Sequence, residues 1–258
     1  MSEYRVTARN YSESSENRIH SDEIAKKYGF RGALVPGVAV YGHLTYPLVE
    51  RLGADWLAHS TANIRLLKPT YDGEEVIVRC HEDNGQYHVT SHSPVGELTA
   101  ELTSTMPATL PALENVSLLE NEYKLPERVE ISWNTVVPKQ AFPPWEFELS
   151  SAENQRYTSE VSDNLELYKN KAIHPHLLLS LANTALTNEY FMPTWIHASS
   201  NTRHRQQLFE GDSIVIKSVP LDKWERKGHE FIRLWVTYWR NGEITTDILH
   251  TAIYKVAV

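Results

Sequence analysis

The same succession of strand-like and helix-like hydrophobic patterns occurs twice along the chain. Residues 3 to 11 alternate as in a strand, and residues 37 to 52 carry apolar side chains at helical spacing, with Gly53 expected just after the helix end. Strand-like segments follow near residues 58–68, 74–82, 86–93 and 97–106. Because one face of an antiparallel sheet must be covered, we expect the apolar helix to be buried against these strands.

The second half of the chain repeats this pattern at an offset of 138 positions. The offset places Arg18 on Arg156, Ser21 on Ser159, Asn63 on Asn201 and Gly73 on Gly211. The run "PHLLLSLANTALTNEYF" falls on the first helix, and strand-like segments recur near residues 196–208, 212–221, 229–240 and 243–257. Two copies of one unit predict an α+β protein in which antiparallel sheet wraps a long helix twice. We assign an N-terminal unit to residues 1–106, a crossover to 107–140 and a C-terminal unit to 141–258.

Composition and charge narrow the class of protein. With 25 Lys and Arg against 33 Asp and Glu, the net charge of -8 gives no general attraction to nucleic acid or to anionic membranes. The single cysteine, Cys80, cannot form an internal disulfide, and no apolar run is long enough for a signal peptide or a membrane span. We expect a soluble, cytoplasmic protein with a small-molecule substrate and no nucleic-acid or membrane partner.

The run "ENRIH…IAKKYGFRG…VPG" resembles the N-terminal part of the MaoC-like dehydratases, the (R)-specific enoyl-CoA hydratases of hotdog fold. The duplication resembles the double-hotdog members of that family. Their motif is D-x-N-P-x-H, followed by an alanine, a G-F-x-G segment and a glycine that begins the central helix. On this chain the matching positions are Asn17, His20, Ala25, Gly29, Phe30, Gly32 and Gly37.

The resemblance implies a double-hotdog fold and a lyase that hydrates an enoyl thioester or dehydrates a 3-hydroxyacyl thioester. It assigns His20 as acid and base, Asn17 as the residue that orients it, and the Gly37 N–H as the donor for the thioester oxygen. Val35, Pro36 and Tyr41, around the helix start, are expected to bind substrate. Arg65 is expected either to bind CoA phosphates or to pair with an acid on a neighbouring strand.

The motif departs from the family where catalysis is most sensitive, because the aspartate position holds Ser15 and the proline position holds Arg18. A serine hydroxyl can orient water but cannot act as a carboxylate. Glu16, or Glu13, supplies the missing charge if the loop folds suitably, and a carboxylate beside His20 would raise the pKa of that histidine.

The second copy lacks an equivalent site. The offset places Thr158 at the position of His20, and a displaced reading of "SDNLEL" puts Asp163 at the aspartate and Tyr168 at the histidine. Either reading is incomplete, so the resemblance implies one site, in the N-terminal unit, and a C-terminal unit that is mainly structural and shapes the substrate pocket. The pair His174 and His176 lacks a third ligand nearby, and we expect no metal.

Two alternatives remain open because of Ser15. One is a diverged hotdog enzyme, such as an isomerase, a cyclase or a dehydratase acting on a substrate not carried on CoA. The other is a catalytically silent acyl-CoA-binding protein. No cofactor is expected, since acyl-CoA would be a substrate, and the protein is expected to be a monomer or a homodimer.

Overall fold

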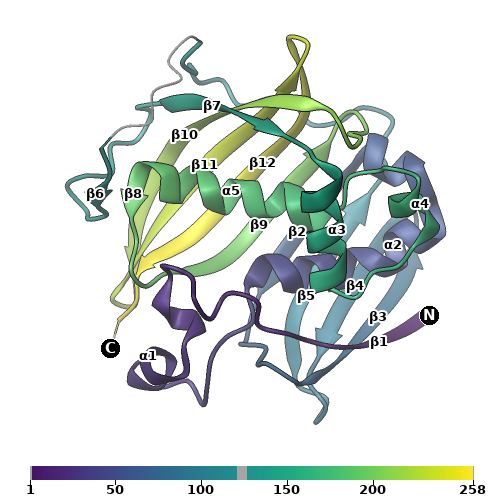
Figure 1. The fold of residues 1–258 in the computed structure, drawn as a ribbon, viewed down its shortest axis with the longest axis horizontal. Coiled ribbons are helices and arrows are strands. Elements are labelled where there is room, and N and C mark those ends of the chain that lie inside the picture. The colour runs from purple at the N-terminus through teal and green to yellow at the C-terminus, as the bar shows by residue number, and fades with distance from the viewer. Residues whose placement is uncertain (1, 121–126, 258) are drawn as a thin grey trace.

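The computed structural model describes residues 2–120 and 127–257, and most of its strands form one ten-stranded antiparallel sheet (Figure 1). In chain order the sheet contains β1 (Ser2–Thr7), β2 (Ser60–Leu66), β3 (Glu75–Asp83), β4 (Gln86–His92), β5 (Leu98–Thr105), β7 (Phe142–Glu148), β9 (Ile196–His204), β10 (Ser213–Arg226), β11 (His229–Arg240) and β12 (Glu243–Lys255). The short strands β6 (Val129–Glu130) and β8 (Tyr190–Phe191) form a separate parallel pair.

The strand order is symmetric about the middle of the sheet. It runs β1-β3-β4-β5-β2-β9-β12-β11-β10-β7, so each strand of the first half has its repeat partner at the mirrored place. The halves join where β2 pairs with β9, and there the repeat-equivalent residues Asn63 and Asn201 lie opposite each other. The internal repeat is therefore a structural repeat whose two copies share one sheet.

The long helices α2 (Gly37–Ala58) and α5 (Pro175–Glu189) lie on one face of this sheet, where α2 crosses the first half and α5 the second (Figure 1). The shorter helices are α1 (Asp22–Lys27), α3 (Ser151–Glu160) and α4 (Glu166–Lys169), and a 3-10 turn lies at Arg18–His20. Apolar residues surround both long helices, and Tyr41, Leu44, Leu177 and Leu186 have no exposed surface. A helix that is apolar over most of its circumference is stable only in such a core.

Two local predictions need correction. The first strand ends at Thr7, not at residue 11. Gly53 leaves helical geometry, with φ 62° and ψ -142°, but the helix resumes and ends at Ala58. The buried Trp56, whose Nε1 donates to Ser104 Oγ at 2.8 Å, holds this last turn against β5. In place of the polar turn of the first half, the second half has helix α3, which Ser150 caps.

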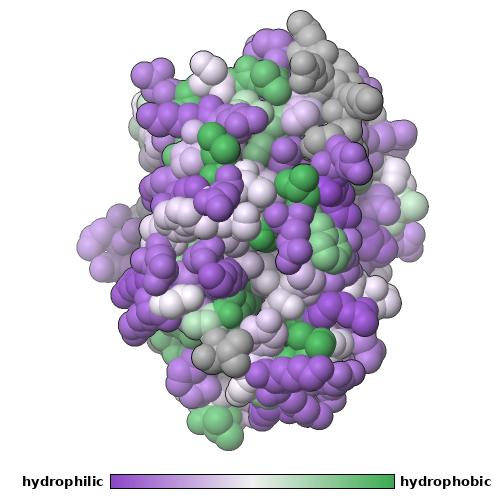
Figure 2. Space-filling model, turned by 90° about the vertical axis from the view of Figure 1, so that its left-hand side faces the viewer, coloured by the Kyte–Doolittle hydropathy of each residue, from purple (hydrophilic) through white to green (hydrophobic). Residues whose placement is uncertain are grey.

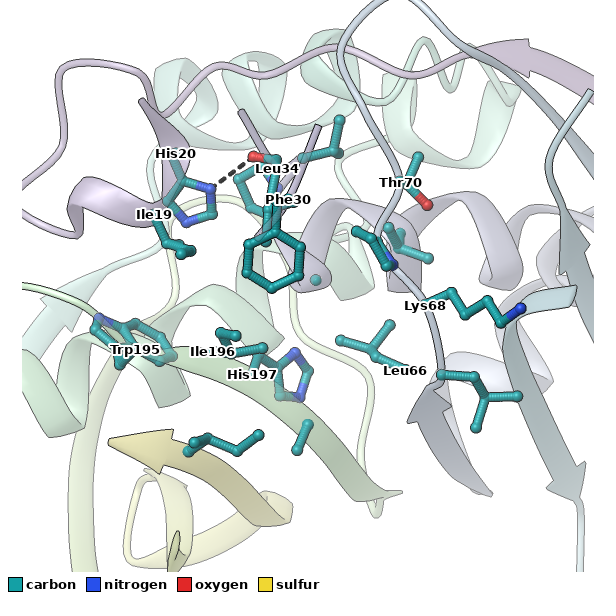
Figure 3. Close-up of a pocket in the computed structure, with 18 of the residues that line it drawn as sticks. Ile19, His20, Phe30, Leu34, Leu66, Lys68, Thr70, Trp195, Ile196 and His197 are labelled. Atoms are coloured by element: carbon teal, nitrogen blue, oxygen red, sulfur yellow. Dashed lines mark hydrogen bonds between the residues drawn. The ribbon is translucent and has the colours of Figure 1, made fainter. Parts of the chain in front are cut away.

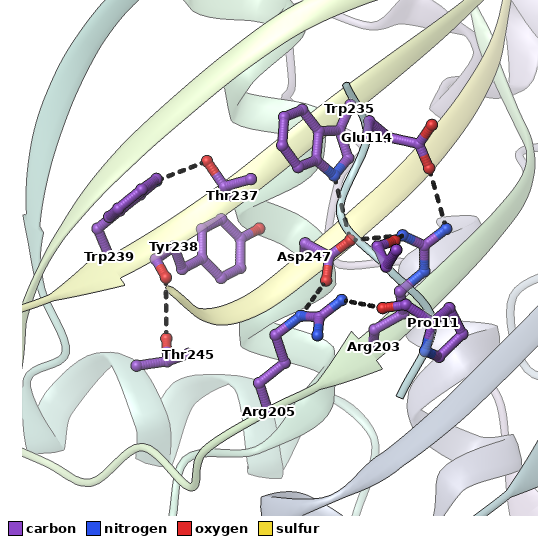
Figure 4. A network of polar contacts seen from close by, with 11 residues as sticks. Pro111, Glu114, Arg203, Arg205, Trp235, Thr237, Tyr238, Trp239, Thr245 and Asp247 are labelled. Carbon is purple, nitrogen blue, oxygen red and sulfur yellow. Dashed lines mark hydrogen bonds and ion pairs between the residues drawn. The ribbon is translucent and has the colours of Figure 1, made fainter. Parts of the chain in front are cut away.

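The predicted crossover is anchored to the second half in its described part, and residues 121–126 lie outside the described residues. Asp247 on β12 accepts from Arg203 at 3.0 Å, Arg205 at 2.6 Å and the Trp235 indole at 3.1 Å (Figure 4). The two arginines also donate to the crossover, at the carbonyl oxygens of residues 111 and 112 and at Glu114. This buried network fixes the start of the crossover over β9.

The molecular surface in Figure 2, on the side that carries β6 and β8, is mainly hydrophilic, with apolar residues scattered among the polar ones. The described part of the chain contains no helix whose length and apolar character would let it span a bilayer.

Candidate functional site

Two cavities meet at His20. The first, here the apolar cavity, has a volume of about 230 Å³ and lies between the start of α2, the end of β2 and the start of β9 (Figure 3). Its wall includes Phe30, Leu34, Val35, Leu66, Trp195 and Ile253. The second, here the polar cavity, has about 550 Å³, and its wall includes Ser15, Asn17, Glu160, His176, Ser180 and Thr184. An imidazole at this junction can reach a group that extends into both cavities.

The His20 ring is held in one protonation state. Its Nδ1 lies 2.7 Å from the Leu34 carbonyl oxygen, which can only accept, so Nδ1 carries the proton and Nε2 holds the lone pair. Burial lowers the pKa of His20, only partly offset by that hydrogen bond. The ring is therefore neutral at neutral pH, with Nε2 available as a base.

Asn17 positions the ring and links it to the second half. Its Oδ1 accepts from the backbone N–H groups of Ile19, at 3.4 Å, and Trp195, at 3.1 Å, and its Nδ2 donates to the Trp195 carbonyl at 3.0 Å. These bonds leave one Nδ2 hydrogen, directed at His20 Nε2 over 3.3 Å. The long distance makes this last bond weak, so it orients Nε2 without fully occupying it.

The acidic residues of the turn do not take the place of the missing aspartate. The Glu16 carboxylate pairs with Arg128, and this guanidinium lowers the pKa of Glu16. Ser15 Oγ donates to the Asn17 carbonyl at 3.2 Å. Among the described residues, no carboxylate hydrogen-bonds to the His20 ring, Glu13 included. The condition for a raised His20 pKa is therefore not met among the described residues, and desolvation without a neighbouring anion lowers the pKa instead.

Gly37 is the first residue of α2 and lines the apolar cavity. A Cβ there would overlap Leu66 Cδ1 and come within 2.9 Å of His197 Nδ1, so only glycine allows this close approach. The first N–H groups of a helix have no intrahelical acceptor and lie at the positive end of its dipole. Val35 and Pro36 line the same cavity, as expected of substrate-binding residues.

Two other residues predicted to bind substrate lie elsewhere. Tyr41 is fully buried in the core and lines neither cavity, because it lies one turn inside α2, where the helix faces the sheet. Arg65 alternates along β2 with the buried Ile64, so it faces away from the helices and pairs with Glu101 at 2.7 Å. This contact agrees with the acid-pairing alternative for Arg65, and Arg65 lines neither of the two cavities at His20.

His197 is a site residue that sequence reasoning did not single out. It lies on β9 in the wall of the apolar cavity, and it is 5% exposed. Its position beside Gly37 depends on the meeting of β9 with α2, which are distant in sequence. The sequence around a single histidine at the start of a strand does not predict a contact with a distant helix.

The second half uses its own histidine for structure. His174 caps α5, with Nδ1 accepting from the His176 N–H at 3.0 Å, and Nε2 lies 3.1 Å from Asp163 Oδ2. Tyr168 packs against the same ring at 4.5 Å between centroids. Asp163 and Tyr168 thus surround a buried helix cap rather than an open site. No group of three or more potential metal ligands lies together in the described residues.

No protein-family model and no curated protein matches this sequence, whereas solved structures match almost all of the chain. A protein from Chloroflexus aurantiacus J-10-fl, provisionally described as a MaoC domain protein dehydratase, has a TM-score of 0.66 at 14% identity, over 97% of this chain and 93% of its own. A conserved hypothetical protein from Mycobacterium tuberculosis with a double hotdog fold has 0.60 at 11% identity, over 98% and 96%. A protein from Lactobacillus plantarum, provisionally described as an oleoyl thioesterase, has 0.54 at 8% identity, over 100% and 98%. At these identities the likeness establishes the fold, and the predicted double hotdog fold, shared with MaoC-like dehydratases, is confirmed for this chain.

Proposed function

We propose that this protein adds water to the double bond of an enoyl thioester, or removes water from the 3-hydroxyacyl thioester, with His20 as both base and acid. The observation that carries the proposal is the state of His20. Its ring is neutral, its tautomer is set by Leu34, and its side chain lines both the apolar and the polar cavity.

In the hydration direction, His20 Nε2 takes a proton from water while the water oxygen bonds to Cβ of the substrate. The electron pair of the double bond then moves onto the thioester oxygen, where the Gly37 N–H stabilises the enolate. The protonated Nε2 returns its proton to Cα, and the carbonyl re-forms. Because burial makes the imidazolium a stronger acid than usual, this return is favoured.

One group therefore handles both proton transfers, and no carboxylate is required. Asn17 holds the ring in place through its bond of 3.3 Å to Nε2, and this weak bond is given up when Nε2 takes the proton. The apolar cavity, at about 230 Å³, is smaller than the pockets that hold drug-sized ligands, so we propose a short acyl group there. The polar cavity would hold the hydrophilic carrier.

The absence of a carboxylate beside His20, among the described residues, favours a second candidate. Moving a double bond along the acyl chain needs one base that takes a proton from one carbon and delivers it to another. Such an isomerase would use His20 and the Gly37 N–H in the same way, without a water. A protein that binds acyl-CoA and turns nothing over is the remaining alternative.

Hydration of crotonyl-CoA by the wild-type protein and by His20→Ala tests the proposal. Loss of a general acid and base reduces rates by about 10²- to 10⁴-fold. His59→Ala is the matched control, since the His59 ring also bonds a backbone carbonyl at 2.7 Å but lines neither cavity. Equal rates for wild type and His20→Ala would remove His20 from the chemistry. Conversion of a 3-enoyl-CoA to the 2-enoyl isomer, without hydration, would favour the isomerase.

A further inference from the structure

The buried His197 has one ring nitrogen that no protein group satisfies. Its Nε2 lies 2.8 Å from Ser200 Oγ, whereas its Nδ1 has no hydrogen-bond partner among the residues that the structure describes. A buried polar atom without a partner costs about 1 to 3 kcal/mol. Because His197 lines the apolar cavity, a ligand in that cavity can supply the missing partner.

The orientation of this nitrogen links it to the start of α2. Nδ1 lies 2.9 Å from the point that a Cβ on Gly37 would occupy, so the two residues share the same end of the cavity. In Figure 3, His197 lies across the cavity from His20, with Leu66 and Ile196 beside it. A thioester whose reacting carbons face His20 would direct its carbonyl oxygen toward the opposite wall.

A short polar chain behind His197 can fix its tautomer. Ser200 Oγ also lies 2.9 Å from His250 Nδ1, and the two imidazole rings stack at 4.5 Å between centroids. The serine has one proton to donate. When Ser200 donates to His197 Nε2 and accepts from His250 Nδ1–H, the remaining proton of His197 lies on Nδ1, on the side of the ring next to the start of α2.

From this arrangement we infer that His197 is a second oxyanion donor, contributed by the C-terminal half, whose Nδ1–H bonds the thioester oxygen together with the Gly37 N–H. Ser200 and His250 act as positioning residues that select the donating tautomer. Burial keeps the pKa of His197 at about 4, so the ring is neutral and carries a single proton at neutral pH. The inference rests on the proposed function for its substrate and extends it across both halves of the chain.

The decisive variant is His197→Phe, which removes the donor and also the unsatisfied buried nitrogen. We expect it to fold, and to lower kcat for crotonyl-CoA hydration by about 100-fold, as loss of one oxyanion donor does elsewhere. Ser200→Ala, which keeps the imidazole but frees its tautomer, should give a smaller loss. His204→Phe is the matched control, because His204 is equally buried on β9 with an unpartnered Nε2 in the described chain, yet lines neither cavity.

A second measurement separates this inference from the hydratase proposal. In the His20→Ala background, crotonyl-CoA should bind without reacting, and infrared spectroscopy of its thioester carbonyl reports the donors directly. We expect the stretch to move to lower wavenumber on binding, and the added His197→Phe change to reverse part of that movement. A shift that depends on His197, together with a wild-type protein that does not hydrate crotonyl-CoA, would support the inference and contradict only the reaction. A folded His197→Phe protein with unchanged kcat and carbonyl stretch would overturn the inference, as would failure of the wild type to bind the thioester.

Discussion

The two halves of this protein place a histidine near the start of each long helix, but they use it differently. In the first half, His20 bonds the Leu34 carbonyl through Nδ1, its Nε2 receives the weak 3.3 Å bond from Asn17, and the ring lies at the junction of two cavities. In the second half, both nitrogens of His174 are engaged, one by the α5 backbone and the other by Asp163, and the side chain is fully buried.

The first residues of α2 and α5 also differ, in whether they can donate a backbone hydrogen bond. The offset of 138 positions places Pro175 on Gly37. Proline has no backbone N–H, so α5 cannot offer at its first position the donor that α2 offers. A histidine contributes to chemistry only if a nitrogen is left open to a cavity and a donor lies nearby. The first half meets both conditions, whereas the second half uses its histidine as a helix cap.

The largest effect is expected from His174→Ala. The change leaves Asp163 buried without its partner and α5 without its cap, which should lower the free energy of unfolding by about 3 to 5 kcal/mol. Denaturant unfolding measures the loss, and His174→Asn, which keeps a capping acceptor, should recover part of it. The folded fraction should retain its kcat. A loss of kcat with unchanged stability would instead make His174 a participant in the reaction.

Gly37→Ala tests the role of the start of α2 in the first half. The added Cβ overlaps Leu66 and crowds His197, which should cost about 1 to 3 kcal/mol of stability and displace the helix start. A displacement near 1 Å can reduce kcat/KM by about 100-fold. Gly42→Ala is the control, since its Cβ would also come close to a neighbour, Val161 Cγ1 at 2.9 Å, but away from the thioester. Equal activity of the two variants would remove the helix start from the site.

The stability of the fold should depend on pH through its buried histidines. Desolvation lowers the pKa values of His43, His197 and His204 to about 4, against 6.5 for an exposed histidine. Between pH 6.5 and 4, these histidines are therefore protonated in the unfolded chain and neutral in the native state. The free energy of unfolding should fall as pH drops from 6.5 toward 4, by up to about 1.4 kcal/mol per pH unit for each such histidine. Unfolding curves at several pH values measure the slope of the free energy of unfolding against pH. His204→Phe should reduce this slope by the contribution of one proton, about 1.4 kcal/mol per pH unit. An unchanged slope in that variant would show that His204 is not held neutral by the fold.

Ser15→Asp is expected to have the smallest effect. A carboxylate at this wall of the polar cavity, near His20, should raise the pKa of the imidazole and strengthen it as a base, for a gain in hydration of about tenfold. Ser15→Asn, of similar size without the charge, separates the electrostatic part. No gain, together with loss of native activity on another substrate, would indicate a diverged reaction.

Much of the fold could be predicted from the sequence because its patterns are local and occur twice. Alternating strands and an apolar helix each leave a periodic signature, and the repeat confirmed one half against the other. The crossing of α2 with β9 left none, so the placement of His197 beside Gly37 could not be foreseen. Contacts between distant segments also decide the role of Glu16. Its carboxylate pairs with Arg128, 112 residues away, and this partner could not be read from the sequence. The burial of Tyr41 and the pairing of Arg65 with Glu101 depend on which side of α2 and β2 meets the core, and the pattern of one helix or strand does not settle that.

The most direct test of the account is the fate of solvent hydrogen at Cα. Crotonyl-CoA hydrated in D₂O by the wild-type protein should give a 3-hydroxy product with one deuterium at Cα, delivered by His20 Nε2, and NMR spectroscopy of the product detects it. His20→Ala should form this product at least about 100-fold more slowly, while His59→Ala should match the wild type. Deuterated product formed at the same rate by His20→Ala would contradict the assignment of His20 as the group that moves the proton.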